Sequence, residues 1–152
     1  MSGSVVSAVC SIIVADLNDQ PAYKCLSYTW GEPTHTGAIL LDGAEFPVGQ
    51  NLFGATTYLS TCPSARISPI WIDEVCINQQ DLQERSQQVG MMRRIHSQAE
   101  EVLVWLGPAT ALDSVAIPLT KRLARKELDS IRHFYDRPWF ERIWVIQEAV
   151  LA

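Results

Sequence analysis

The stretch ISPIWIDEVCINQQDLQERSQQVGMMRRIHSQAEEVLVWL, Ile67 to Leu106, decides the fold of this chain. It contains two short apolar runs, Ile67–Ile72 and Val102–Leu106, which predict strands buried on both faces. Between them, Leu82–Ala99 has apolar residues at helical spacing, and Asp81 with Glu84 three residues later predicts a capped helix start. The predicted apolar stripe of this helix is Val89, Met92, Ile95 with His96, and Ala99. A helix between two buried strands predicts parallel pairing with a right-handed crossover.

The sequence before this stretch predicts further strands. Val5–Val14 is rich in Val and Ile and predicts a first strand, and Tyr23–Tyr28 predicts a second, short one. Ala38–Leu41 and Glu45–Val48 flank Asp42-Gly43, a dipeptide typical of hairpin turns. We expect Tyr23–Tyr28, Ile67–Ile72 and Val102–Leu106 as adjacent, mostly parallel strands of one sheet, to which the hairpin is added.

Helical patterns flank the central stretch on both sides. After the hairpin, Leu52, Ala55 and Leu59 recur at helical spacing, and Asn51 before them is the predicted N-cap. Ala111–Tyr135 is polar and partly helical in pattern, and a final helix is expected from Pro138. The whole order predicts one α/β domain over residues 1–152, with a mostly parallel sheet flanked by helices and an added β-hairpin.

Composition limits the kinds of function. With 152 residues, 47 % hydrophobic and 19 % charged, the chain has enough apolar material for one folded domain. A net charge of −5 without a long basic run argues against binding to a nucleic-acid backbone. No apolar run is long enough to span a bilayer, and the first residues lack a secretion signal. We therefore expect a cytoplasmic protein that binds neither nucleic acid nor membrane, with Cys10, Cys25, Cys62 and Cys76 as buried free thiols.

Polar and aromatic residues gather where the predicted strands end, which is where open α/β sheets bind ligands. The candidates for substrate binding lie at the ends of the predicted strands Tyr23–Tyr28 and Ile67–Ile72: Ser27, Tyr28, Trp30, Asp73 and Asn78. Each also has a structural interpretation: Tyr28 as core, Asp73 as a turn acceptor, and Asn78 as part of a helix-capping loop. Cys76 is a weak candidate nucleophile, and no ligand pair has the spacing of a metal site.

Three segments carry a resemblance to a known family. They are YKCLSYTWG at Tyr23–Gly31, WIDEVCINQQDLQER at Trp71–Arg85, and RPWFERIWVIQEAVLA at Arg137–Ala152. In this order and at this spacing they resemble the heterokaryon-incompatibility (HET) domain of filamentous fungi, over residues 23–152. The resemblance implies an intracellular module for self/non-self recognition that triggers programmed cell death. It implies self-association or binding to other incompatibility proteins.

The end of the chain departs from the usual family pattern. Members of this family usually continue well beyond the closing motif, whereas this sequence ends at Ala152. We therefore expect either a fragment or a minimal member without a C-terminal sensing domain.

A more distant resemblance suggests chemistry. HET domains resemble TIR domains, which have a flavodoxin-like fold, and some TIR domains cleave NAD with one helical glutamate. Trp144 and Glu148 match that pattern, so the resemblance implies Glu148 as catalytic residue, Trp144 as substrate-binding residue, and NAD as substrate rather than cofactor. The plainer alternative is an exposed Glu148 or a salt bridge to Arg142 or Arg137. If the enzymatic interpretation holds, Glu148 lies at the rim of a cleft between the loops after Tyr28 and Asp73.

Overall fold

Two small sheets and three α-helices make up the part of the chain that the computed structural model describes, residues 5–32, 34–63 and 68–110. The elements in chain order are β1 (Val6–Cys10), the 3₁₀ turn η1 (Leu17–Asp19), β2 (Lys24–Tyr28), β3 (His35–Leu41), β4 (Ala44–Gly49), α1 (Gln50–Thr61), β5 (Ile70–Trp71), α2 (Asp73–Cys76), α3 (Leu82–Gln98) and β6 (Glu101–Trp105). The α/β class is confirmed. The predicted helices after residue 110 lie outside the described residues.

The central sheet has the order β5-β2-β6, and both of its strand pairs are parallel. Cys25 of β2 pairs with Trp71 of β5 on one side and with Val102 of β6 on the other. This confirms the predicted adjacency of the three strands. Two details differ: β5 has only two residues, both half-buried, and Val104 of β6 is 44 % exposed. β2 is almost fully buried, because core residues cover both of its faces.

The second sheet has the order β1-β3-β4. β3 and β4 form the predicted hairpin, and Asp42 and Gly43 in its turn have positive φ values of 50° and 84°. β1 runs parallel to β3, so the strand and hairpin form a sheet separate from the central one. The prediction that Val5–Val14 is one strand is wrong. β1 ends at Cys10, where the chain bonds to the hairpin turn instead of continuing along β3. The Asp42 N–H donates to the Cys10 carbonyl, and the Asp42 carboxylate accepts from the Ile12 N–H.

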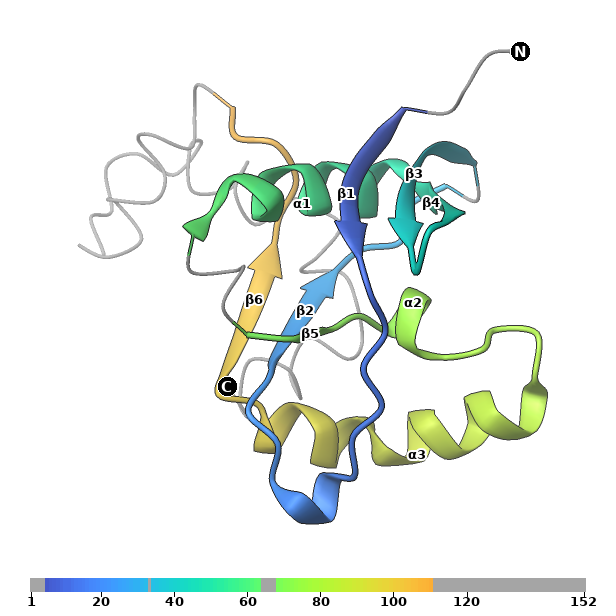
Figure 1. The fold of residues 1–152 in the computed structure, drawn as a ribbon, viewed down its shortest axis with the longest axis vertical. Coiled ribbons are helices and arrows are strands. Elements are labelled where there is room, and N and C mark those ends of the chain that lie inside the picture. Colours follow the sequence, from blue (N-terminus) through green and yellow to red (C-terminus); the bar gives the residue numbers. More distant parts are fainter. Residues whose placement is uncertain (1–4, 33, 64–67, 111–152) are drawn as a thin grey trace, which may run out of the picture.

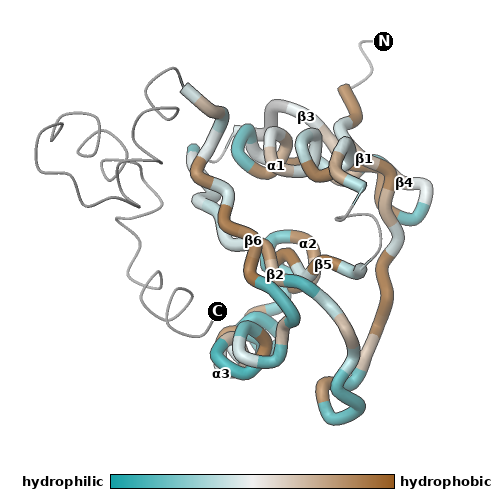
Figure 2. Tube along the Cα trace, turned by 90° about the vertical axis from the view of Figure 1, so that its left-hand side faces the viewer, coloured by the Kyte–Doolittle hydropathy of each residue, from teal (hydrophilic) through white to brown (hydrophobic). Residues whose placement is uncertain are grey.

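The helices cover opposite ends of the central sheet. In Figure 1, α1 crosses above the C-terminal ends of β2 and β6, whereas α3 runs below their first residues. The tube in Figure 2 shows the same arrangement from the side, with brown apolar stretches of β2 and β6 between the two helices. The larger core, beneath α1, consists of Leu26, Tyr28, Ile39, Val48, Leu52 and Ala55. The smaller core, above α3, consists of Tyr23, Cys25 and Ile95.

The helix starts confirm one prediction and correct another. Asp81 caps α3 as predicted, accepting from the Gln83 and Glu84 N–H groups, although Glu84 accepts from the Asn78 N–H rather than completing a capping box. Asn51 is not the N-cap of α1: Gly49 holds that position. The helix begins two residues earlier than an Asn51 N-cap predicts, since Gln50 is already helical directly after β4, and the Asn51 side chain makes another contact.

The α3 stripe and the cysteines also differ from expectation. Ile95 and His96 are buried and Met92 is half-buried, but Val89 is 47 % exposed, so the start of the predicted stripe faces solvent. All four cysteines are free, but of the four only Cys25 is buried as predicted: Cys62 is half-buried, and Cys10 and Cys76 are exposed. Within the described residues no helix has the length and hydropathy needed to cross a membrane.

Candidate functional site

The candidate site forms where β2 and β5 end side by side. β2 ends at Tyr28 and continues into a loop with Trp30, while β5 is followed directly by α2, whose first residues are Asp73 and Glu74. Because β2 and β5 are parallel neighbours, their carboxyl ends meet at one edge of the sheet. The one-turn helix α2, which follows β5 directly, was not predicted from the sequence. Tyr28, Trp30, Asp73 and Glu74 are called the strand-end cluster below.

Trp30 and Asp73 are directly hydrogen-bonded. The indole Nε1 of Trp30 donates to Oδ2 of Asp73 at 2.9 Å. The other carboxylate oxygen, Oδ1, accepts from the Glu74 backbone N–H at 2.8 Å. Both oxygens of Asp73 therefore have partners inside the chain. The Trp30 side chain is still 43 % exposed, so its ring meets solvent while its N–H is bonded to Asp73.

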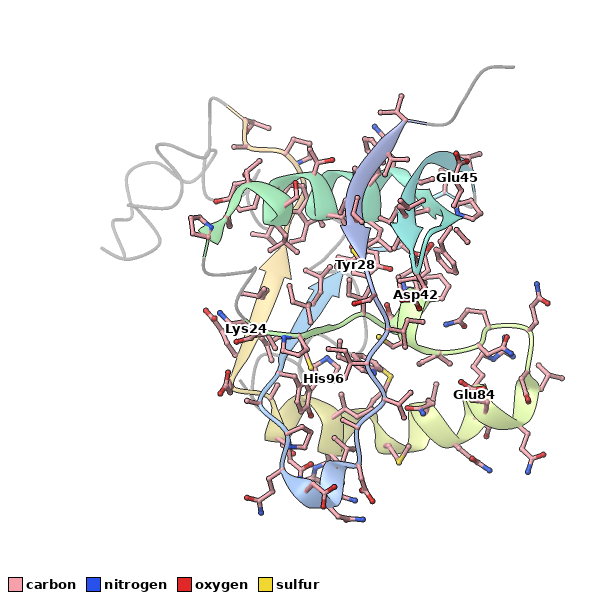
Figure 3. The ribbon with its side chains drawn as sticks, in the orientation of Figure 1. Lys24, Tyr28, Asp42, Glu45, Glu84 and His96 are labelled. Atoms are coloured by element: carbon pink, nitrogen blue, oxygen red, sulfur yellow. The ribbon has the colours of Figure 1, made fainter. Side chains whose placement is uncertain are left out.

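Tyr28 makes the second link between the two segments. Its hydroxyl donates to Oε2 of Glu74 at 2.6 Å, and the residue is only 1 % exposed. Figure 3 labels Tyr28 below α1, at the end of β2. Burial raises the pKa of the Tyr28 hydroxyl, and the negative charges of Asp73 and Glu74 raise it further. Tyr28 is therefore a neutral hydrogen-bond donor at physiological pH. Glu74 was not among the predicted site residues, although a buried tyrosine hydroxyl needs a nearby acceptor.

Two amide side chains fix the backbone around the cluster. Nδ2 of Asn51, from the first turn of α1, donates to the Thr29 carbonyl at 2.9 Å. Nε2 of Gln79 donates to the Asp73 carbonyl at 2.9 Å. Gly31 follows Trp30 with a φ of 78°, and a Cβ there would lie 3.3 Å from the Asn51 amide. The loop after β2 is thus held between α1 and α2.

The other predicted site residues lie apart from this cluster or outside the described residues. Ser27 is buried, 2 % exposed, and pairs with Val104 in the β2–β6 ladder. Asn78 is exposed, and its side chain accepts from the Gln80 N–H at 3.1 Å, which makes it part of the turn before α3. Trp144 and Glu148 lie outside the described residues. The structure therefore brings together Tyr28, Trp30 and Asp73 from the predicted set.

Nucleophile and metal chemistry have little support in the described part of the chain. Cys76 is exposed as a residue, but its sulfur faces the backbone and accepts from the Ile72 N–H, and desolvation there raises the pKa of the thiol, which lowers the fraction of reactive thiolate. His96 is buried, with Nδ1 2.9 Å from the Met92 carbonyl and its ring edge against Trp71. Among residues 5–32, 34–63 and 68–110, no three His, Cys, Asp or Glu side chains are grouped so that they could hold a metal ion. The cluster itself offers an exposed indole beside a carboxylate.

Comparison with known proteins gives two concordant matches. The family model described as Heterokaryon incompatibility protein (HET) matches residues 23–148. Heterokaryon incompatibility protein 6, OR allele, of Neurospora crassa is 34 % identical over 157 aligned residues, which cover 93 % of this chain. The same alignment covers 22 % of the Neurospora protein, so the chain spans less than a quarter of that relative's length. No solved structure matches the chain significantly.

Proposed function

The chain belongs to the heterokaryon-incompatibility (HET) family, and on that basis we propose that it is a self/non-self recognition and signalling module of a filamentous fungus. In this proposal residues 1–152 form one domain that acts in the cytoplasm, associates with itself or with other incompatibility proteins, and triggers programmed cell death. The observation that carries the proposal is the 34 % identity over nearly the whole chain to a fungal incompatibility protein. Four free cysteines agree with a reducing compartment.

The strand-end cluster supports a recognition module over an enzyme. The polar atoms that enzymes use for chemistry are engaged within the chain here: Asp73 accepts with both oxygens, and Glu74 accepts from Tyr28. The same bonds fix the Trp30 ring in one orientation at the surface. A fixed, partly exposed tryptophan is typical of protein-binding surfaces, because little conformational entropy is lost when a partner covers it.

Expression in fungal hyphae tests this proposal. The chain is placed under an inducible promoter in Neurospora crassa, and vital-dye uptake is measured after induction. Trp30→Ala removes the exposed ring, and Val89→Ala on α3 truncates another exposed apolar side chain as the matched control. We expect death with the wild-type chain and the control, and a clear loss of death with Trp30→Ala at equal protein level. Healthy hyphae that accumulate folded wild-type chain would contradict the proposal.

A second candidate function is NAD cleavage by a TIR-like enzyme with a flavodoxin-like fold. The observation that favours it is the position of Trp30 and Asp73 at the carboxyl ends of parallel strands, where α/β sheets bind nucleotides. In this alternative Trp30 or Trp144 stacks on a base and Glu148 stabilises the positive charge that develops on the ribose.

Nicotinamide release separates the two functions. Concentrated pure protein is incubated with NAD, and Glu148→Gln is compared with Glu141→Gln, which makes the same change two helical turns earlier in the expected final helix. If the chain is an enzyme, Glu148→Gln lowers turnover by roughly a hundredfold, about 3 kcal/mol of transition-state stabilisation, while the control keeps it. No nicotinamide from wild-type protein at any concentration would leave the recognition module as the function.

A further inference from the structure

β1 leaves one side of its sheet open. It pairs with β3 on one side only, and in the described part of the chain no strand lies on the other side. Two of its valines are exposed to solvent: Val6 is 40 % exposed and Val9 is 77 % exposed. β1 also lies before residues 23–148, so it falls outside the segment that matches the family model. Its role is therefore not given by the family pattern.

The backbone of β1 presents an irregular set of free groups. The four residues Val6–Val9 of β1 lie opposite the three residues Ala38–Leu40 of β3, so β1 contains one extra residue. The carbonyls of Val5 and Cys10 point toward β3, where they accept from the Ala38 and Asp42 N–H groups. Successive carbonyls of a strand alternate in direction, so the peptide groups of Val6 and Val9 point outward. They are three residues apart instead of the usual two.

The three-residue spacing between the outward peptide groups of Val6 and Val9 limits which strands can pair with β1. A regular strand presents its free groups two residues apart and cannot bond fully to both Val6 and Val9. A second copy of β1, reversed by a two-fold axis, presents the same three-residue spacing, so Val6 of one copy faces Val9 of the other. Such a pairing is self-complementary and closes as a dimer.

The charge pattern also favours a second copy. The chain carries a net charge of −5, yet residues 5–15, VVSAVCSIIVA, contain no Asp, Glu, Lys, Arg or His. Two copies therefore meet along this segment without like charges facing each other. The other sheet edges contain features that discourage pairing: β4 carries Glu45 and Pro47, β5 has two residues after Pro69, and β6 begins with Glu101. β1 alone has none.

We propose that β1 is a homodimerisation edge, at which two copies of this chain pair antiparallel through the peptide groups of Val6 and Val9. The pairing joins two three-stranded sheets into one six-stranded sheet and covers the exposed valines. It rests on the proposed function, and it identifies β1 as the surface through which the chain self-associates. The test below measures the assembly of pure protein and not cell death. A negative result for the β1 dimer therefore leaves the proposed recognition function standing, and the reverse also holds.

Sedimentation equilibrium of the 152-residue chain tests the dimer, over roughly two orders of magnitude in protein concentration. Val9→Lys places a charge on each copy of the edge, and Val9→Pro removes the outward N–H without breaking a bond to β3. Val89→Lys makes the same apolar-to-charged change on exposed α3 and is the matched control. Circular dichroism confirms that each variant is folded.

We expect a monomer–dimer equilibrium whose Kd rises roughly tenfold or more in both Val9 variants and is unchanged in Val89→Lys. Hydrogen exchange adds a local readout: the Val6 and Val9 amides of wild-type protein become protected as concentration rises. A wild-type chain that stays monomeric throughout would overturn the proposal. So would a dimer that both Val9 variants form as tightly as wild type, because the contact would then lie on another face.

Discussion

Tyr28→Phe probes the bond that joins the β2 end to α2. The change removes one hydroxyl from a residue that is 1 % exposed and leaves its ring in the core. The lost bond runs from that hydroxyl to Oε2 of Glu74 at 2.6 Å. Hydrogen bonds to charged groups contribute roughly 1.5–3 kcal/mol, and Glu74 is half-buried and regains only part of its hydration. We expect the free energy of unfolding at pH 7 to fall by about 2 kcal/mol.

The same variant changes the response to alkaline pH. In the folded protein burial and the charges of Asp73 and Glu74 raise the pKa of Tyr28 above the value of about 10 that it has in the unfolded chain. Above pH 10 the unfolded state therefore releases a proton that the folded state keeps. Wild-type stability then falls by about 1.4 kcal/mol per pH unit from this group, and Tyr28→Phe lacks that loss. The difference in free energy of unfolding between wild type and Tyr28→Phe keeps its full value of about 2 kcal/mol below pH 10. It falls to zero at about pH 11.5.

Urea unfolding followed by tryptophan fluorescence measures this difference at pH 7, 9, 10 and 11. The raised pKa of Tyr23 is present in both proteins and cancels in the comparison. Tyr58→Phe is the control, because Tyr58 is 58 % exposed and the change keeps its ring contact with Trp105. A Tyr28→Phe protein within about 0.5 kcal/mol of wild type at pH 7 would refute the reasoning. An unchanged alkaline slope would refute it as well.

Two further substitutions test the packing of the fold. Gly37→Ala places a Cβ 2.2 Å from the ring of Phe53, so we expect a loss of about 2–3 kcal/mol in urea unfolding; a loss below about 0.5 kcal/mol would show that the ring shifts freely. Asp81→Ala removes the acceptor for the Gln83 and Glu84 N–H groups at the start of α3, so we expect a loss of about 1 kcal/mol in a thermal melt followed by circular dichroism. An unchanged melting temperature would argue against this cap.

The features that the sequence predicted correctly depend on neighbouring residues. The hairpin follows from Asp42-Gly43, because this dipeptide adopts the positive φ values that the turn requires. The start of α3 follows from Asp81, whose side chain bonds to N–H groups two and three residues later. The parallel pairing of β2 with β5 and β6 follows from short apolar runs and the capped helix between two of them.

The features that the sequence missed depend on distant residues. The Val and Ile run does not stop at Cys10, and the strand ends there because Asp42, far along the chain, captures the following peptide. Asn51 is a good N-cap residue by type, but its side chain bonds to the Thr29 carbonyl instead. Glu74 became part of the cluster only when β5 placed it beside Tyr28. No local pattern contains these contacts.

The polar residues of the first two motifs have a physical explanation that needs no substrate. The first motif supplies the donors, the Tyr28 hydroxyl and the Trp30 indole, and the second supplies the acceptors, Asp73 and Glu74. Each of these donors therefore finds its acceptor only when the second motif is present. The consequence is the same for a protein partner and for a nucleotide base: either would meet a Trp30 ring that is already oriented by Asp73. Binding at this surface then loses little side-chain entropy, which favours affinity and specificity together.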